Sequence, residues 1–209
     1  MTRRVLHLAI AGTLAAMAMA PIQARADFEL IYEPTPNNGA AAAPGTFVYS
    51  AAFNTQLDAG TGQPAETLTS GSFVTLYDVP GLINFALDPA FASRFTLTSQ
   101  STGMTPSGIA PPDSSAPNLT LVYNGPTLST TTFFTNVFSL TSQFTGTAPG
   151  AGYFSGQDTK GTGPSAGSSI GSIGRITQPA AATPEPASLV MLAIGLVGVG
   201  ATYRSRRRA

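Results

Sequence analysis

The sequence predicts an all-β fold, an antiparallel sandwich or jelly-roll-like domain, flanked by a signal peptide and a C-terminal transmembrane helix. Three observations predict the β domain. Short runs of β-branched and aromatic residues recur, turn-forming Pro, Gly, Asn and Asp separate the runs, and no run has the length, charge spacing and caps of an amphipathic helix. Strands without helical crossovers pair antiparallel and bury their apolar faces between two sheets.

Six runs are the predicted strands. The first two mix aromatic and aliphatic residues, the third to fifth alternate them with Thr or Ser, and the sixth is rich in Phe. They cover residues 28–33, 46–53, 72–77, 94–98, 118–123 and 133–144. Turn signals separate them at residues 34–39, 78–81, 111–113 and 124–126. Residues 82–91 are the stretch in which we expect one or two helical turns.

The aromatic residues place the folded domain at residues 27–154. Seventeen of the eighteen Phe and Tyr residues lie between Phe28 and Phe154. Burying one such ring contributes about 1.5 to 3 kcal/mol, so these rings suffice for a core. Residues 155–183 are rich in Gly, Ser, Thr, Ala and Pro. An edge strand is compatible with the spacing of Ile170, Ile173 and Ile176 in this segment, but we expect the segment to be a flexible tether.

The N-terminal 26 residues have the pattern of a secretory signal peptide. Basic residues precede an apolar run at residues 5–20, and Pro21 then precedes the small-residue site formed by Ala24 and Ala26. We expect signal peptidase to cut after Ala26 once the export machinery has engaged the chain. His7 is the only histidine and lies in the removed segment, and the chain has no Cys. We therefore expect no cofactor, no metal site and no His- or Cys-based catalysis.

The C-terminal residues 184–209 have three parts in a fixed order. Pro184, Glu185 and Pro186 come first, followed by an uncharged apolar stretch at residues 187–203 and then by a basic cluster. The stretch has the minimum length of a membrane-spanning helix. The basic residues are Arg204, Arg206, Arg207 and Arg208. Arginines beside an apolar span hold that end in the cytoplasm, so they lock the topology and place the preceding chain outside.

These three parts resemble the PEP-CTERM sorting signal of Gram-negative bacteria. The resemblance implies that a membrane-embedded exosortase cuts near Pro184, Glu185 and Pro186, which are then substrate and not catalyst. It also implies an inner-membrane intermediate and then a cell-surface or extracellular location, commonly beside extracellular polysaccharide. An uncleaved single-span periplasmic anchor protein is the alternative, because hydropathy and the arginines fit it equally well.

The exported part is acidic, although the whole chain has a formal net charge of zero. Between residues 27 and 183 there are three Lys and Arg residues, Arg94, Lys160 and Arg175, against nine Asp and Glu residues, a net charge of −6. Such a charge disfavours binding to phosphate backbones and to anionic lipid. We expect no nucleic-acid partner.

An enzyme is one alternative class. Paired carboxylates hydrolyse glycosidic bonds when they lie about 5 to 9 Å apart in a cleft. The carboxylates that could pair are Asp27, Glu29 and Glu33, and Asp78 with Asp88. Acidic residues in turns usually bond nearby backbone amides, and Lys160 lies in the Gly-rich tract. We expect the protein not to be an enzyme.

An exopolysaccharide-binding module is the other alternative. Tyrosines stack on sugars when they are exposed, and the candidates are Tyr32, Tyr49, Tyr77, Tyr123 and Tyr153. Asp113, Ser114, Ser115 and Asn118 form the one local oxygen cluster that could favour calcium, although a turn explains it as well. Asn118 also begins a glycosylation sequon, and residues 129–132 are weak candidates for O-linked sugar. The function that we expect is non-enzymatic, a structural or interaction role at the cell surface or in the extracellular matrix.

Overall fold

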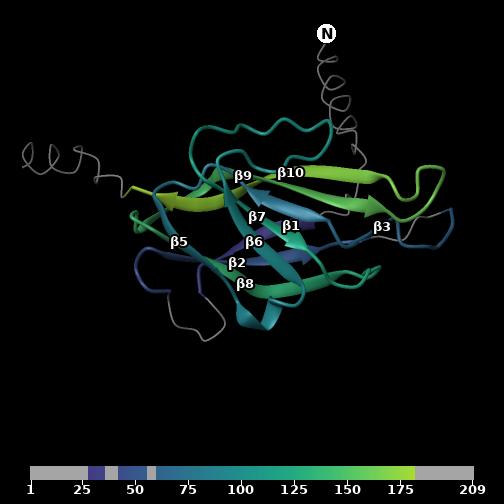
Figure 1. Cartoon of the computed structure of the whole chain (residues 1–209), viewed down its shortest axis with the longest axis horizontal. Helices are drawn as coiled ribbons and strands as arrows, with labels where there is room; N and C mark the ends of the chain where they lie inside the picture. Colours follow the sequence, from purple (N-terminus) through teal and green to yellow (C-terminus); the bar gives the residue numbers. More distant parts are fainter. Residues whose placement is uncertain (1–27, 36–41, 56–59, 182–209) are drawn as a thin grey trace, which may run out of the picture.

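The structure, a computed structural model, describes residues 28–35, 42–55 and 60–181. The expected signal peptide, residues 1–26, and the C-terminal residues 184–209 lie outside the described residues. Within the described part, the chain forms two antiparallel sheets, which confirms the predicted all-β fold (Figure 1). No helix of this part has the length and hydropathy needed to cross a membrane.

The first sheet has four strands in the order β1-β2-β8-β5. They are β1 (Phe28–Glu33), β2 (Thr46–Phe53), β8 (Thr132–Ser142) and β5 (Leu82–Leu87). The second sheet has the order β10-β9-β4-β7-β6, with the short β3 paired to β9. Its strands are β3 (Glu66–Thr67), β4 (Phe73–Leu76), β6 (Phe95–Gln100), β7 (Asn118–Tyr123), β9 (Gly146–Lys160) and β10 (Ser169–Ala180).

All six predicted strands are present, with ends that differ by at most two residues. The region 82–91 differs from expectation, because residues Leu82–Leu87 form strand β5 and only Pro89–Phe91 form a 3-10 turn. The side chain of Asp88 caps this turn by accepting a hydrogen bond from the amide of Ala90 at 2.8 Å. Leu82, Phe85 and Leu87 pack on the core, which favours the strand over a helix.

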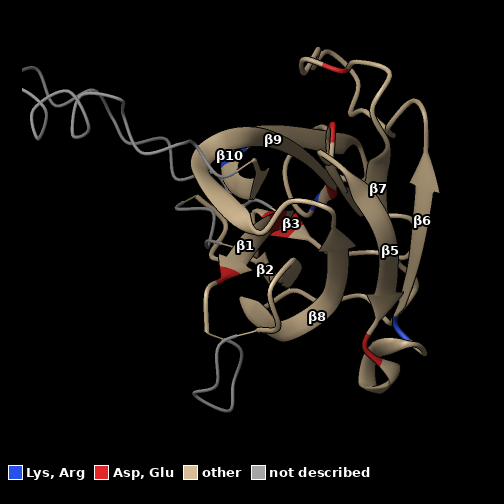
Figure 2. Ribbon diagram, turned by 90° about the vertical axis from the view of Figure 1, so that its left-hand side faces the viewer, with Lys and Arg blue, Asp and Glu red and all other residues tan. Residues whose placement is uncertain are grey.

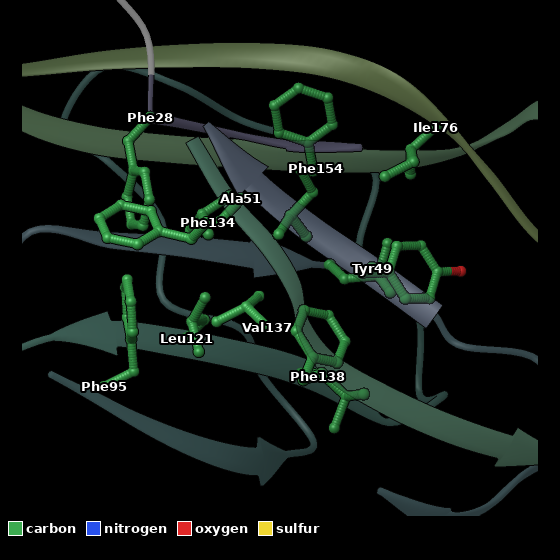
Figure 3. Packing of buried hydrophobic residues seen from close by; sticks show 14 of the residues in the cluster. Phe28, Tyr49, Ala51, Phe95, Leu121, Phe134, Val137, Phe138, Phe154 and Ile176 are labelled. Carbon is green, nitrogen blue, oxygen red and sulfur yellow. The ribbon is translucent and has the colours of Figure 1, made fainter. Parts of the chain in front are cut away.

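Aromatic rings from both sheets meet in the core between them (Figure 3). Phe134 of β8 is 2% exposed, and its ring lies edge-on to that of Phe95 of β6, with centroids 5.0 Å apart. Phe95 in turn contacts Tyr123 of β7 and Phe28 of β1. This cluster joins the outer strands β1 and β6 of opposite sheets, so the two layers are held by side chains rather than by backbone pairing.

Residues 155–183, which we expected to be a tether, instead contain strands. β9 continues to Lys160 and β10 pairs with it from Ser169 to Ala180. Backbone hydrogen bonds join these two strands, and Ile176, 5% exposed, reaches the core. The expectation of a tether was wrong, because a low content of large apolar residues does not by itself make a segment flexible. A strand at the side of a sheet needs a backbone partner more than it needs its own apolar face.

Glycines in this pair make room for neighbouring side chains. A Cβ atom on Gly174 would lie 2.5 Å from the ring of its cross-strand partner Phe154, and one on Gly152 would lie 2.2 Å from the side chain of Gln178. At Gly156, an added Cβ would lie 1.8 Å from the carbonyl oxygen of Phe28 in the other sheet. At these glycines, a neighbouring side chain or carbonyl group therefore packs directly against the backbone.

The connections divide the sandwich into two ends. At the end where β10 finishes, Gly45, Pro80, Gly81 and the segment 142–147 lie together, and we call this the C-terminal end. At the opposite end, which we call the distal end, β2 finishes, β8 begins and the 3-10 turn joins β5 to β6. Figure 1 shows β10 finishing on the same side of the molecule as the start of β5.

Candidate functional site

The last strand is fixed to both sheets just before the described chain ends. The phenol of Tyr49 in β2 donates a hydrogen bond to the carbonyl of Thr177 at 3.0 Å. The amide of Gln178, which is 4% exposed, donates to the carbonyl of Tyr77, which follows β4. Together with the burial of Ile176, these contacts hold β10 in place as far as Ala180. We call these two side-chain hydrogen bonds the β10 lock.

Burial sets the protonation of the tyrosine in this lock. Tyr49 is fully buried, and burial raises its pKa well above the ordinary value of 10.0, with Tyr32 nearby raising it further. The ring of Tyr32 lies 5.8 Å from that of Tyr49, and partial burial raises its pKa too. Tyr49 is therefore a neutral hydrogen-bond donor, which is the form that the Thr177 carbonyl needs.

The connection between β6 and β7, residues 101–117, folds back over the second sheet. The phenol of Tyr77 bonds to the carbonyl of Met104 at 2.7 Å and to the hydroxyl of Ser155 at 2.7 Å. Thr75 donates to the same carbonyl at 2.8 Å. Long connections in compact domains are usually functional or disordered, and these bonds show that this one is built into the fold.

The oxygen cluster that we considered for calcium is part of this connection. Asp113 accepts hydrogen bonds from the amide of Gly103 at 3.2 Å and from the side chain of Asn118 at 2.9 Å. Asp78 accepts from the hydroxyl of Ser114 at 2.6 Å and from its backbone amide. These carboxylates point to different partners rather than toward one ion, so the arrangement is a structural turn. Within the described residues, no three His, Cys, Asp or Glu side chains are grouped as metal ligands.

Asn118 itself is unsuited to glycosylation in the folded protein. It is fully buried, and the nitrogen to which a glycan would be attached donates to Asp113 and to the carbonyl of Ser101. In the stretch considered for O-linked sugar, residues 129–131 are exposed. The hydroxyl of Thr131 donates to the carbonyl of Thr55 at 3.2 Å.

Three of the five candidate tyrosines belong to the core. Tyr49, Tyr77 and Tyr123 are at most 1% exposed, and burial raises the pKa of Tyr123 against the opposing effect of Arg94. Tyr32 is partly buried against aromatic neighbours. The guanidinium of Arg175 lies 4.5 Å from the ring centre of Tyr153 and covers that ring. The structure therefore does not bring these rings together as an open platform for sugars.

Among the described residues, the structure does not join the candidate catalytic carboxylates into one site. Glu29 accepts a hydrogen bond from Asn54 at 2.7 Å, Asp88 caps the 3-10 turn and Asp78 bonds Ser114. Glu33 ends β1, and Asp27 lies outside the described residues. Lys160 ends β9 beside β3. Glu29, Asp78 and Asp88 therefore each have a local structural role.

A hollow of about 320 Å³ opens on the outer face of the first sheet. Its wall comprises Val48, Ala86, Leu87, Asp88, Pro89, Asn136, Phe138 and Ser139. Asn136 has a φ of 55° at a point where the pairing of β8 with β2 shifts register. Its side-chain oxygen is buried and has no hydrogen-bond partner among the described residues. The bulge thus brings Asn136 into the wall of a largely apolar hollow, as bulges near binding sites often re-aim a residue, while its side-chain oxygen stays covered.

Sequence reasoning missed Asn136 and Gln178. Strict alternation along β8 would place Asn136 on the buried face with Phe134 and Phe138. A polar residue at an apolar position of a strand is the signal that could have indicated the bulge. For Gln178, the adjacent Pro179 and the Gly-rich surroundings hid the strand altogether.

The segment that follows β10 matches a known protein-sorting motif. The family model of the PEP-CTERM protein-sorting motif matches residues 182–208, which include the Pro184–Pro186 tripeptide and all four arginines of the basic cluster. No curated protein and no solved structure matches the chain. The motif confirms the resemblance found in the sequence. The chain thus carries a PEP-CTERM sorting signal, which makes it an exported protein with exosortase as its processing partner and with sorting at a membrane.

Proposed function

We propose that the protein is a non-enzymatic component of the cell surface or extracellular matrix, delivered there by exosortase cleavage. Signal peptidase removes residues 1–26, residues 187–203 stop transfer in the inner membrane, and Arg204–Arg208 remain in the cytoplasm. Exosortase then cuts at or near Pro184–Pro186 and frees the β domain. The observation that carries this proposal is the sorting motif at residues 182–208, directly after the last strand.

The engaged carboxylates support a structural or interaction role. A glycosidase needs one carboxylate that protonates the leaving group and a second that activates water or attacks. In this domain, Asp88 caps a turn and Asp78 holds Ser114 of a long connection. Acidic residues in such roles contribute to folding and to solubility, as expected for an exported scaffold of net negative charge.

The mass of the mature protein, purified from the native host with and without its exosortase, tests this proposal. We expect a chain that begins near residue 27 and ends near residue 186, with the C-terminal end shifted to residue 209 when exosortase is deleted. A chain that ends at residue 209 in both strains would overturn the proposal and leave an uncleaved single-span periplasmic anchor protein.

A second candidate function is binding of extracellular polysaccharide, which the hollow beside Asn136 favours. Its aliphatic wall, with Val48, Ala86 and Pro89, suits the C–H face of a sugar, and Asp88 and Ser139 in the same wall supply oxygens for its hydroxyl groups. The test compares the mature protein with its Asn136→Gly variant in binding to the exopolysaccharide of the host. Glycine keeps the positive φ and removes the side chain. Saturable binding that weakens in the variant supports this function, and equal binding or none contradicts it.

A further inference from the structure

The folded domain ends very close to the predicted cleavage site. The β10 lock holds the strand through Gln178, and Ala180 still pairs with Gly146 of β9. Four residue steps separate Ala180 from Pro184. A fully extended chain spans at most about 3.3 to 3.6 Å per residue, so Pro184 lies within about 14 Å of the last residue of the sheet. The tether that would separate the domain from the cleavage site is absent from the described residues, because its sequence is β9 and β10.

The membrane segment is close to the domain as well. Seven residue steps separate Ala180 from Ala187, where the apolar stretch begins. The same limit puts the start of this stretch within about 25 Å of the sheet. β10 alone, with 12 residues, is about 40 Å long at a rise of about 3.3 Å per residue. A membrane-embedded enzyme that reaches Pro184 must therefore approach the end of a domain that is larger than the connecting segment.

A membrane-embedded enzyme that reaches Pro184 would meet the C-terminal end of the sandwich. Hydrogen bonds make this end one continuous structure, because Ser142 bonds the carbonyl of Gly45 through its amide and that of Pro80 through its hydroxyl, both at 2.8 Å. The amide of Gln143 donates to the carbonyl of Gly81 at 2.9 Å. The following residues, 146–148, pair with the end of β10.

The part of the C-terminal end next to the last residues of β10 lacks charged side chains and carries an exposed apolar one. Residues 44–45, 80–83, 142–147 and 180–181 contain no Asp, Glu, Lys or Arg. The acidic residues of this end are Glu33, where β1 finishes, and Asp78, which follows β4. Ile83, at the start of β5, is 66% exposed, the largest exposure among the large apolar side chains of the described residues. Figure 2 faces this side of the molecule and shows charged residues only in scattered positions. A surface patch that lacks charged side chains and exposes an aliphatic group fits a partner at the membrane surface.

We propose that the C-terminal end of the sandwich docks directly on exosortase, so that the folded domain contributes to substrate recognition beyond the sorting motif. This inference rests on the proposed cleavage and adds a second contact to it. Ile83, on the edge strand β5, is the exposed apolar residue of the docking surface, and the β10 lock fixes that surface relative to Pro184. The short connection enforces the contact, because the enzyme cannot reach the tripeptide without meeting this end.

The test measures the cleavage rate of the full chain in the native host by pulse-chase. Ile83→Asp places a charge on the docking surface, and we expect it to slow cleavage about fivefold or more, as the loss of an apolar interface contact does. Phe133→Asp is the matched control, because Phe133 is 52% exposed and lies at the distal end. We expect this control to be cut at the rate of the unmodified chain.

A longer linker between the domain and Pro184 distinguishes docking of the domain from simple access of exosortase to the tripeptide. With about ten Gly and Ser residues inserted between Ala181 and Ala182, a flexible linker lets exosortase bind the tripeptide away from the domain. We expect the inserted chain to be cut at the same rate with Ile83 or with Asp at that position. Equal rates for Ile83→Asp and the unmodified chain without the insertion would overturn the docking proposal. So would equal slowing by Phe133→Asp. Absence of cleavage in the unmodified chain would instead refute the proposed function itself.

Discussion

Strands β8 and β10 are nearly equal in length, 11 and 12 residues, but different forces hold them. β8 buries Phe134, Val137, Phe138 and Leu140 to 2% exposure or less, so apolar burial fixes it in the first sheet. β10 buries one large aliphatic side chain, Ile176. Its position depends on pairing with β9 and on side chains of other strands that bond its backbone or pack against it. A Gly-rich sequence can therefore be as ordered as an aromatic one when its neighbours supply the side chains.

The largest difference between the two strands should appear when one aromatic ring is removed from β8. Phe134→Ala deletes a ring that contacts Phe91, Phe95 and Tyr123, and we expect the free energy of unfolding of the mature protein to fall by about 3 to 5 kcal/mol. Urea denaturation measures it. Phe133→Ala is the control, because that neighbouring ring is 52% exposed, and we expect a loss within about 0.5 kcal/mol. Similar losses in the two variants would contradict the view that burial holds β8.

A methyl group added to β9 should produce the next largest effect. Gly156→Ala places a Cβ atom 1.8 Å from the carbonyl oxygen of Phe28, and both groups belong to backbones that must move apart. Overpacking of this kind costs about 1 to 3 kcal/mol or more. Thr147→Ala, at an exposed position of the same strand, should change unfolding by less than about 0.5 kcal/mol. A Gly156→Ala variant as stable as the control would mean that the two sheets do not approach so closely there.

These two strands also mark what the sequence could predict. Alternation and aromatic content located β8 and the other five runs, because those signals reflect burial of a residue's own side chain. β10 escaped because its order comes from partners distant in sequence. Tyr49 lies 128 residues away from Thr177, and Gln178 lies 101 residues from Tyr77. No local pattern records such contacts.

The candidate sites divide in the same way. The sorting motif is a linear signal, read in order along the chain, and its resemblance was visible from the residues and confirmed by the family match. The hollow beside Asn136 and the docking surface around Ile83 arise from register and topology. Asn136 lines the hollow because a bulge breaks the alternation of β8, and Ile83 lies at the C-terminal end because β5 is a strand rather than the expected helical turns.

Loosening the β10 lock should have a smaller effect, confined to one strand. Gln178→Ala removes the donor to the Tyr77 carbonyl and leaves a gap against Gly152, and we expect a loss of about 1 to 3 kcal/mol. Native-state hydrogen exchange should show faster exchange at residues 174–180, while residues 134–140 of β8 keep their protection. An equal increase in amide exchange rate in both strands would indicate that β10 does not open separately from β8, and would contradict the view that different forces hold the two strands.

The smallest effect concerns the tyrosine of the lock and depends on pH. Tyr49→Phe removes one hydrogen bond, to Thr177, and should cost about 1 kcal/mol at neutral pH. The pKa of Tyr49 is raised above the ordinary value of 10.0 by burial and by Tyr32, so the folded protein keeps its proton while the unfolded chain loses it. Stability from this group is therefore fully present below about pH 10 and declines as pH rises further. Denaturation between pH 8 and about 11 should show a shallower decline for Tyr49→Phe than for the unmodified protein. Parallel declines would mean that Tyr49 ionises in the folded state as easily as in the unfolded chain, which is incompatible with a neutral donor holding β10 to the first sheet.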